Sequence, residues 1–156
     1  PSLADIPWVI FYFVAAAAVV YPIVKARFKI PTKEMLILIA LAIVLISVVY
    51  VTTLQPILAG EDELSIKVLS VLYPVGGVIL FLATIALFLV MKKTTLGSGW
   101  LTFVLAFGCY AVADLVFTYL EAAGTYQTGS FSDILYYTSQ LLFAYAFFLQ
   151  LKIGEQ

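Results

Sequence analysis

The sequence predicts an all-α, polytopic transmembrane bundle of five helices, and two observations support this prediction. Of the 156 residues, 64% are hydrophobic and 11% are charged, and the mean hydropathy is +1.12. Soluble domains carry about 25% charged residues, so a soluble fold of this length could not bury so much apolar surface. The chain also contains five apolar runs that are each long enough to cross a hydrocarbon core of about 30 Å as a helix.

The five predicted spans form a single transmembrane domain over residues 1–156. Because the sequence begins with Pro rather than Met, this domain could be a fragment of a longer protein. The spans cover about residues 6–24, 35–54, 64–91, 100–121 and 134–151. Each must be a helix, because lipid offers no partner for open backbone groups.

Each span has its own character. The first and second are almost uninterrupted apolar runs, and Pro22 lies near the end of the first. The third contains Pro74, which frees a carbonyl group and permits a kink. The fourth contains a carboxylate, Asp114, and the fifth is richer in tyrosine and polar side chains.

The connections between the spans alternate in charge, and this pattern predicts the orientation. The first connection, KARFKIPTKE, and the third, MKKTTLGSG, are basic, and Lys152 lies in the C-terminal tail. The second, AGEDELSIK, is mainly acidic, and the fourth, EAAGTYQTGSFSD, has no cation. Cations concentrate in short cytoplasmic loops. We therefore expect the C-terminus to be cytoplasmic and the N-terminus to lie outside.

Composition also argues against several functions. The chain has no His, one cysteine (Cys109) and a net charge of −1. It therefore offers no His-ligated metal and no Ser-His-Asp triad, and no basic field for nucleic acid. No paired nucleophile and base or metal-ligand cluster is apparent. We expect neither enzymatic activity, nor a metal site, nor a cofactor.

Two short segments resemble each other and predict helix starts. Ser2 and Asp5 in SLADI have the same spacing as Ser130 and Asp133 in SFSDI. In a capping box, the Ser hydroxyl caps an exposed N–H while the acid three residues later reaches back. The likeness indicates either two independent helix caps or a repeat of four spans, as found in some membrane proteins.

The third span contains the sequence YPVGG, in which Pro74 is followed by Gly76 and Gly77. Small residues on one helix face allow a close approach of a neighbouring helix. The segment could therefore serve packing alone, or it could form a bend that lines a cavity.

Asp114 is the only carboxylate well inside a span. It follows Trp100 by 14 residues, or about 21 Å of helix, which places it in the outer half of the fourth span. An ionised Asp in mid-bilayer costs on the order of 3 kcal/mol, so it should face the bundle. Tyr110 and Thr118 share its helix face, and Gln140 in the fifth span is a partner at similar depth. Three interpretations remain open: a structural hydrogen bond, a ligand-sensing group, or a proton relay.

A longer pattern resembles a known family. Tyr73-Pro74, Ala113-Asp114, Gly124-Thr125-Tyr126 and the Ser130-to-Asp133 cap occur in the order found in the membrane-embedded N-terminal sensor regions of many bacterial and archaeal signalling proteins. Those proteins include diguanylate cyclases, phosphodiesterases and sensor kinases. The likeness covers about residues 70–150 and, more weakly, 1–25. Many such regions carry an Asp shortly after the Tyr-Pro, where this chain has Gly76 and Gly77.

The resemblance implies a sensory input module in the cell membrane that relays a signal through helix packing. Its implied partners are the lipid bilayer and a cytoplasmic output domain or partner protein, and a second copy of the chain is a further candidate. The candidate ligand-binding residues are Asp114, Tyr110, Tyr73 and Gln140. Two alternatives remain, namely a small transporter or half-transporter built on a helical repeat, and a structural subunit of a membrane complex.

Overall fold

The computed structural model describes residues 3, 5–26, 30–94 and 96–154. All regular structure in these residues is helical, which confirms the predicted all-α class. Five helical segments among them are long and apolar enough to cross a membrane, so the chain is a multi-pass membrane protein. The elements are, in chain order, α1 (Asp5–Ala26), α2 (Thr32–Val49), η1 (Tyr50–Leu54), α3 (Gln55–Ala59), α4 (Leu64–Met91), α5 (Gly97–Ala122) and α6 (Phe131–Gly154).

The helix boundaries extend slightly beyond most of the predicted spans. α4 has the predicted bounds, whereas α5 and α6 begin at Gly97 and Phe131, three residues before the predicted starts at 100 and 134. Apolar runs mark the part of a helix that meets hydrocarbon, but the helix continues into the polar headgroup region. Hydrophobicity therefore predicts the positions of the spans more accurately than it predicts the residues at which the helices begin and end.

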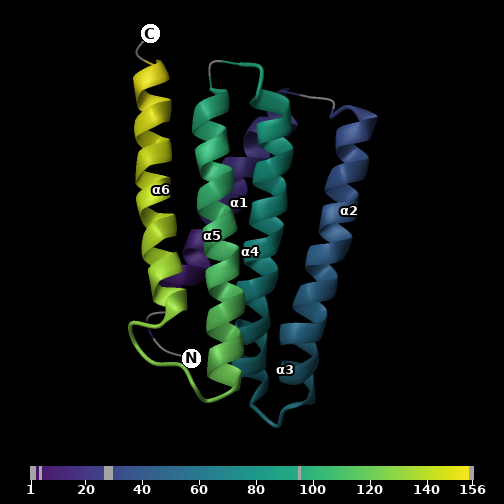
Figure 1. Cartoon of the computed structure of the whole chain (residues 1–156), viewed down its shortest axis with the longest axis vertical. Coiled ribbons are helices and arrows are strands. Elements are labelled where there is room, and N and C mark those ends of the chain that lie inside the picture. Colours follow the sequence, from purple (N-terminus) through teal and green to yellow (C-terminus); the bar gives the residue numbers. More distant parts are fainter. Residues whose placement is uncertain (1–2, 4, 27–29, 95, 155–156) are drawn as a thin grey trace.

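Consecutive spans run in opposite directions, with α2, η1 and α3 forming one span, so α1 and α6 begin at one end of the bundle and α6 finishes at the other (Figure 1). α5 lies between α4 and α6 and packs against both, while α1 and α2 pack against α4. In α5, 50% of the most apolar stretch is buried, against 6% of the most apolar stretch within the helical segment Thr32–Ala59. α5 is therefore the central helix, and α2 is peripheral.

The core lies between α1, α4, α5 and α6. Its members are mostly aromatic or aliphatic: Tyr12, Ala15, Val19, Leu80, Leu87, Phe103, Phe107, Tyr110 and Ala146. On α1 these positions recur every three or four residues, which is the period of one helix face. Outside this core, many large apolar side chains are exposed, including Phe13 at 71% and Leu141 at 73%. An apolar surface of this extent is suited to lipid rather than water.

The second span contains a π turn. Pro56 has no N–H, and its ring would clash with the carbonyl group four residues earlier in a regular α-helix. The helix widens over η1 instead, and the N–H of Gln55 donates to the carbonyl oxygen of Tyr50. The helical structure therefore continues through α3, five residues beyond the predicted end of this span at residue 54.

Two cations join the peripheral helix to α4. Lys92, directly after α4, forms an ion pair with Glu34 in the first turn of α2. At the other end of α4, the Lys67 Nζ donates to the carbonyl oxygen of Gly60 at 2.7 Å, directly after α3. Cations near the C-terminal carbonyls of a helix are stabilising. α2 and α3 are thus held to α4 at both ends.

Candidate functional site

Asp114 is the most deeply buried carboxylate in the described part of the chain, with 2% of its surface exposed. Its Oδ2 accepts a hydrogen bond from the Tyr12 hydroxyl of α1 at 2.5 Å, and its Oδ1 accepts one from the Tyr136 hydroxyl of α6 at 2.7 Å. Hydrogen bonds to charged groups are shorter and stronger than neutral ones. One side chain of α5 therefore joins the first and last described helices.

The Tyr12 hydroxyl has two acceptors within reach. Besides the Asp114 carboxylate, it lies 3.1 Å from the main-chain carbonyl oxygen of Tyr73 on α4. A phenol carries only one proton to donate. Tyr12 can therefore bond α1 to α5 or to α4, but it cannot donate fully to both at once.

The two adjacent glycines of α4 make room for this arrangement. A Cβ atom at Gly77 would lie 2.7 Å from the Asp114 Oδ2 and 3.3 Å from the Ala111 Cα atom. A Cβ atom at Gly76 would lie 2.9 Å from the Tyr12 ring. Any larger residue would occupy the space of the carboxylate or of the ring. The YPVGG segment thus lies directly against the site, and Pro74 is buried within an unbroken α4.

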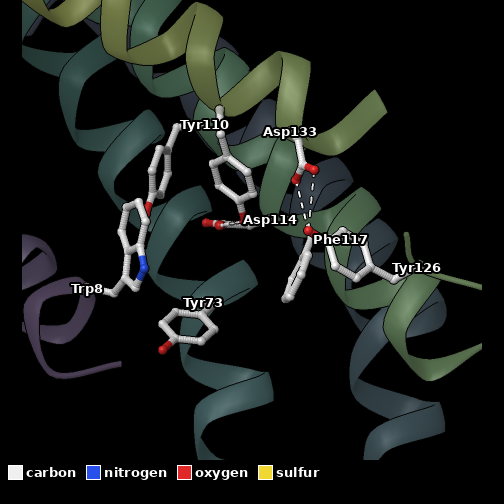
Figure 2. Close-up of a pocket in the computed structure, with 8 residues that line it drawn as sticks. Trp8, Tyr73, Tyr110, Asp114, Phe117, Tyr126 and Asp133 are labelled. Atoms are coloured by element: carbon white, nitrogen blue, oxygen red, sulfur yellow. Dashed lines mark hydrogen bonds between the residues drawn. The ribbon is translucent and has the colours of Figure 1, made fainter. Parts of the chain in front are cut away.

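A cavity of about 270 Å³ lies beside Asp114 (Figure 2). Its walls come from α1, α4, α5, α6 and the connection before α6. Six of the lining side chains are aromatic and two are carboxylates: Trp8, Tyr73, Tyr110, Phe117, Tyr126, Tyr136, Asp114 and Asp133. A concave, mostly apolar site with a few convergent polar groups is the usual form of a small-molecule pocket.

The connection between α5 and α6 brings Asp133 and Tyr126 to this cavity. α5 ends in a Schellman turn, in which Gly124 has a φ of 64° and the Thr125 N–H donates to the Leu120 carbonyl oxygen at 2.9 Å. The left-handed conformation favours glycine here. The Tyr126 hydroxyl then donates to the Asp133 Oδ1 at 3.1 Å, as the dashed lines in Figure 2 show. Desolvation, followed by this hydrogen bond, raises the pKa of the Tyr126 phenol.

The start of α6 differs from the predicted capping box. The Ser130 hydroxyl pairs with the Ser132 hydroxyl at 2.7 Å. Asp133 does reach back, but its Oδ2 accepts from the N–H of Gly129 at 2.6 Å, one residue before Ser130. Gly129 has a φ of 88°, a left-handed conformation that favours glycine. Asp133 therefore closes the helix start and lines the cavity at once.

The predicted capping box of Ser2 and Asp5 falls largely outside the part of the chain that the structure describes. Ser2 lies outside the described residues. Asp5 is the first residue of α1, but its side chain is not among those described.

Three of the four candidate ligand residues lie together. Asp114, Tyr110 and Tyr73 all line the cavity, with Tyr110 one helical turn from Asp114 on α5. Gln140 is exposed on α6 and does not line it. It follows the buried Ser139, and one helical step turns a side chain by about 100°, which points Gln140 toward lipid. The expected partner role on α6 belongs to Tyr136 instead.

Five residues of the site were not among the candidate ligand-binding residues: Trp8, Tyr12, Phe117, Tyr126 and Tyr136. Trp8 and Tyr12 are four residues apart on α1 and precede the buried Ala15 and Val19 at helical spacing. Extending that stripe toward the N-terminus would have placed both residues on the bundle-facing side of α1. Tyr136 had no comparable signal, because the adjacent Tyr137 is of the same residue type and is exposed.

No protein-family model matches this sequence, and no curated protein or solved structure matches it. The functional argument therefore depends on the site itself. In the described part of the chain, no group of three His, Cys, Asp or Glu side chains is placed to hold a metal ion. The arrangement offers two carboxylates, several hydroxyl donors and aromatic side chains around a cavity, which are groups that can bind a small molecule.

Proposed function

We propose that this chain is a sensory input module of the cell membrane, in which a signal enters the cavity and changes helix packing. One observation supports the proposal above all. Asp114 on α5 accepts hydrogen bonds from tyrosine hydroxyl groups of α1 and α6, and it also lines that cavity. A molecule that competes for this carboxylate would act on the contacts of both helices at once.

The two acceptors of Tyr12 give this module two discrete states. In one state the hydroxyl donates to Asp114 on α5, and in the other it donates to the Tyr73 carbonyl oxygen on α4. A ligand shifts such an equilibrium only through its different affinity for the two states. A ligand that occupies Asp114 would favour the second state, because Tyr12 then loses its carboxylate acceptor.

α6 offers a route from the cavity to the opposite end of the bundle. It begins beside the cavity at Phe131, and its C-terminal end lies at the end of the bundle where α1 and α4 end and α2 and α5 begin (Figure 1). The two segments of sequence between these helix ends are the basic ones, and the positive-inside rule places basic loops in the cytoplasm. A shift of α6 would then reach a cytoplasmic output domain or partner protein.

The relay is testable through the distance between the far ends of α1 and α6. Spin labels would replace Val24 and Leu151, which are 70% and 69% exposed, in a Cys109→Ala background. In lipid nanodiscs, we expect Asp114→Asn to shift or broaden the distance distribution, because the amide replaces one of the two acceptor oxygens by a donor. Tyr137→Phe, on an exposed neighbour of Tyr136 in α6, serves as the matched control. An unchanged distribution in Asp114→Asn would count against a relay from the cavity.

Transport is the second candidate function, because of the composition of α4. Tyr73 lines the cavity, and Pro74, Gly76 and Gly77 follow it directly. Helices interrupted by Pro and Gly surround the substrate sites of many transporters. Purified protein in proteoliposomes should show no solute uptake above empty liposomes if the module is a sensor. Uptake that Asp114→Asn abolishes would replace the sensor proposal by transport.

A further inference from the structure

The cavity beside Asp114 combines aromatic walls with two carboxylates, and this combination indicates a class of ligand. Building on the proposed function, in which this cavity receives the signal, we propose that the signal is a small organic cation, a quaternary or protonated ammonium compound. Three features support this inference: the ring faces, the uncompensated negative charge, and the depth at which each carboxylate lies.

The aromatic faces come from three helices and lie close to one another. The ring centroid of Trp8 is 6.2 Å from those of both Tyr110 and Tyr136, and the Tyr110 and Tyr136 centroids are 5.4 Å apart. On the loop side, the Phe117 and Tyr126 rings are 4.9 Å apart. Aromatic faces attract cations within about 6 Å, Trp most strongly, and cages of such rings recognise quaternary ammonium groups.

Neither carboxylate has a cationic partner in the described part of the chain. Asp114 accepts from two neutral phenols, and Asp133 accepts from the Tyr126 phenol and the Gly129 N–H. The ion pair found among those residues, Lys92 with Glu34, lies at the opposite end of the bundle. Each Asp114 oxygen accepts a separate hydroxyl, as suits an ionised carboxylate, which only accepts. The cavity therefore repels anions and favours a positive guest.

The two carboxylates lie at different depths. Asp133 is in the first turn of α6, beside the connection from α5, and is partly exposed. Asp114 precedes the end of α5 at Ala122 by eight residues, or about 12 Å of helix, and is almost fully buried. A cation would meet Asp133 at the rim and settle beside Asp114 among the rings. A volume of about 270 Å³ limits the guest to a small molecule.

Trp8 supplies a direct readout of binding. The sequence has two tryptophans, and Trp100 does not line this cavity, so the Trp100→Phe variant leaves Trp8 as the reporter. The purified chain in nanodiscs would be titrated with choline and with butylammonium at constant ionic strength. Each cation is paired with an uncharged analogue, namely the carbon isostere of choline and butanol. We expect a saturable change of Trp8 emission with the cations and at least about tenfold weaker binding of the uncharged analogues.

Matched charge variants separate the site from the general surface potential. Asp133→Asn should weaken cation binding severalfold, whereas Glu121→Gln should leave it unchanged, since Glu121 is at the same end of the bundle but does not line the cavity. Asp133 also closes the start of α6. The helical content of each variant is therefore checked by circular dichroism, and Tyr136→Phe, which leaves that closure intact, should weaken binding as well.

Two results would overturn the cation proposal. One is equal affinity for the cations and their uncharged analogues, and the other is the absence of a saturable response to either cation in a folded protein. The sensor proposal is tested separately, because the spin-label comparison of Asp114→Asn with the unmodified chain needs no ligand. A relay that works without cation binding would leave the function standing and remove only this ligand class.

Discussion

Asp114 shows how one buried side chain can set the arrangement of several helices. Its two oxygens accept hydrogen bonds from hydroxyl groups of α1 and α6. Its Oδ2 fits against α4 only because Gly77 has no side chain. A buried carboxylate without hydrogen-bond donors is costly. The packing of these four helices therefore also supplies the hydrogen-bond donors that stabilise the buried Asp114 carboxylate.

The Gly77→Ala substitution should destabilise the fold by about 1–3 kcal/mol, the range for inserting a methyl group into a packed interior. The added Cβ would lie 2.7 Å from the Asp114 Oδ2 and 3.3 Å from the Ala111 backbone. Reversible unfolding in mixed micelles measures the change. Gly60→Ala is the control, since its Cβ would find no contact closer than 3.5 Å. Equal effects of both substitutions would contradict the role given to Gly77.

Removing the hydroxyl groups of Tyr12 and Tyr136 should reveal that both donate to the same carboxylate, Asp114. Tyr12→Phe and Tyr136→Phe each take one donor from Asp114, and each should lower the free energy of unfolding by about 1.5–3 kcal/mol. The double variant leaves the buried carboxylate with neither donor, so its cost should exceed the sum of the single costs. The same unfolding measurement gives all three values, with Tyr137→Phe as the control. Strict additivity would show that the two hydroxyls do not depend on each other through Asp114.

At the scale of elements, α4 and α5 carry the site, while α2 contributes little to it. α4 supplies Tyr73, Gly76 and Gly77 within five residues, and α5 supplies Tyr110, Asp114 and Phe117. The cavity residues of α5 recur at three and four positions, which is one face of a helix. α2 instead packs on the outer side of α4 and holds its place partly through Glu34 and Lys92.

Lys92→Gln should weaken the attachment of α2 by leaving Glu34 without its partner. The two side chains are 32% and 24% exposed, and the Glu34 Oε2 is buried without a hydrogen bond. Exposed ion pairs contribute about 0–1 kcal/mol, and we expect the upper part of this range here, decreasing at high salt. Lys93→Gln is the control. Unfolding curves at two salt concentrations test it, and an equal loss in both variants would argue against this pairing.

At the scale of the whole molecule, charge and topology predict how the bundle sits in the membrane. The cavity is at the end where α1 and α6 begin, and the helix ends that flank the two basic segments of the sequence are at the opposite end. If the positive-inside rule holds, the cavity faces the outside. A soluble signal would then reach Asp133 without crossing the membrane.

Cysteine labelling in intact cells tests this orientation. In a Cys109→Ala background, Gln127→Cys would mark the connection between α5 and α6, and Thr94→Cys the connection between α4 and α5. Both positions are exposed and outside the spans. An impermeant maleimide should label the first variant, and should label the second only after the membrane is permeabilised. The reverse pattern would place the cavity on the cytoplasmic side.

Hydrophobicity alone determined the fold class and the positions of the five spans, because each span must be an apolar helix to satisfy its backbone groups in lipid. The same reasoning singled out Asp114, since a charge inside a span is costly wherever it lacks partners. Tyr110 followed from helix periodicity, and Tyr73 from the Tyr-Pro motif of the family resemblance. All of these signals are local in the sequence.

Only the tertiary structure decided which helices meet at Asp114. Tyr12 is 102 positions away in the chain, and its choice as a partner depends on how α1 packs against α4. Gln140 was expected at the site, but Tyr136 is there, because the rotation of α6 about its axis is set by packing and not by composition. The cavity, too, exists only between helices. In lipid, nearly every face of an apolar helix can be exposed to the hydrocarbon at little cost. The sequence pattern therefore specifies the positions of the spans more strongly than the rotation of each helix about its axis.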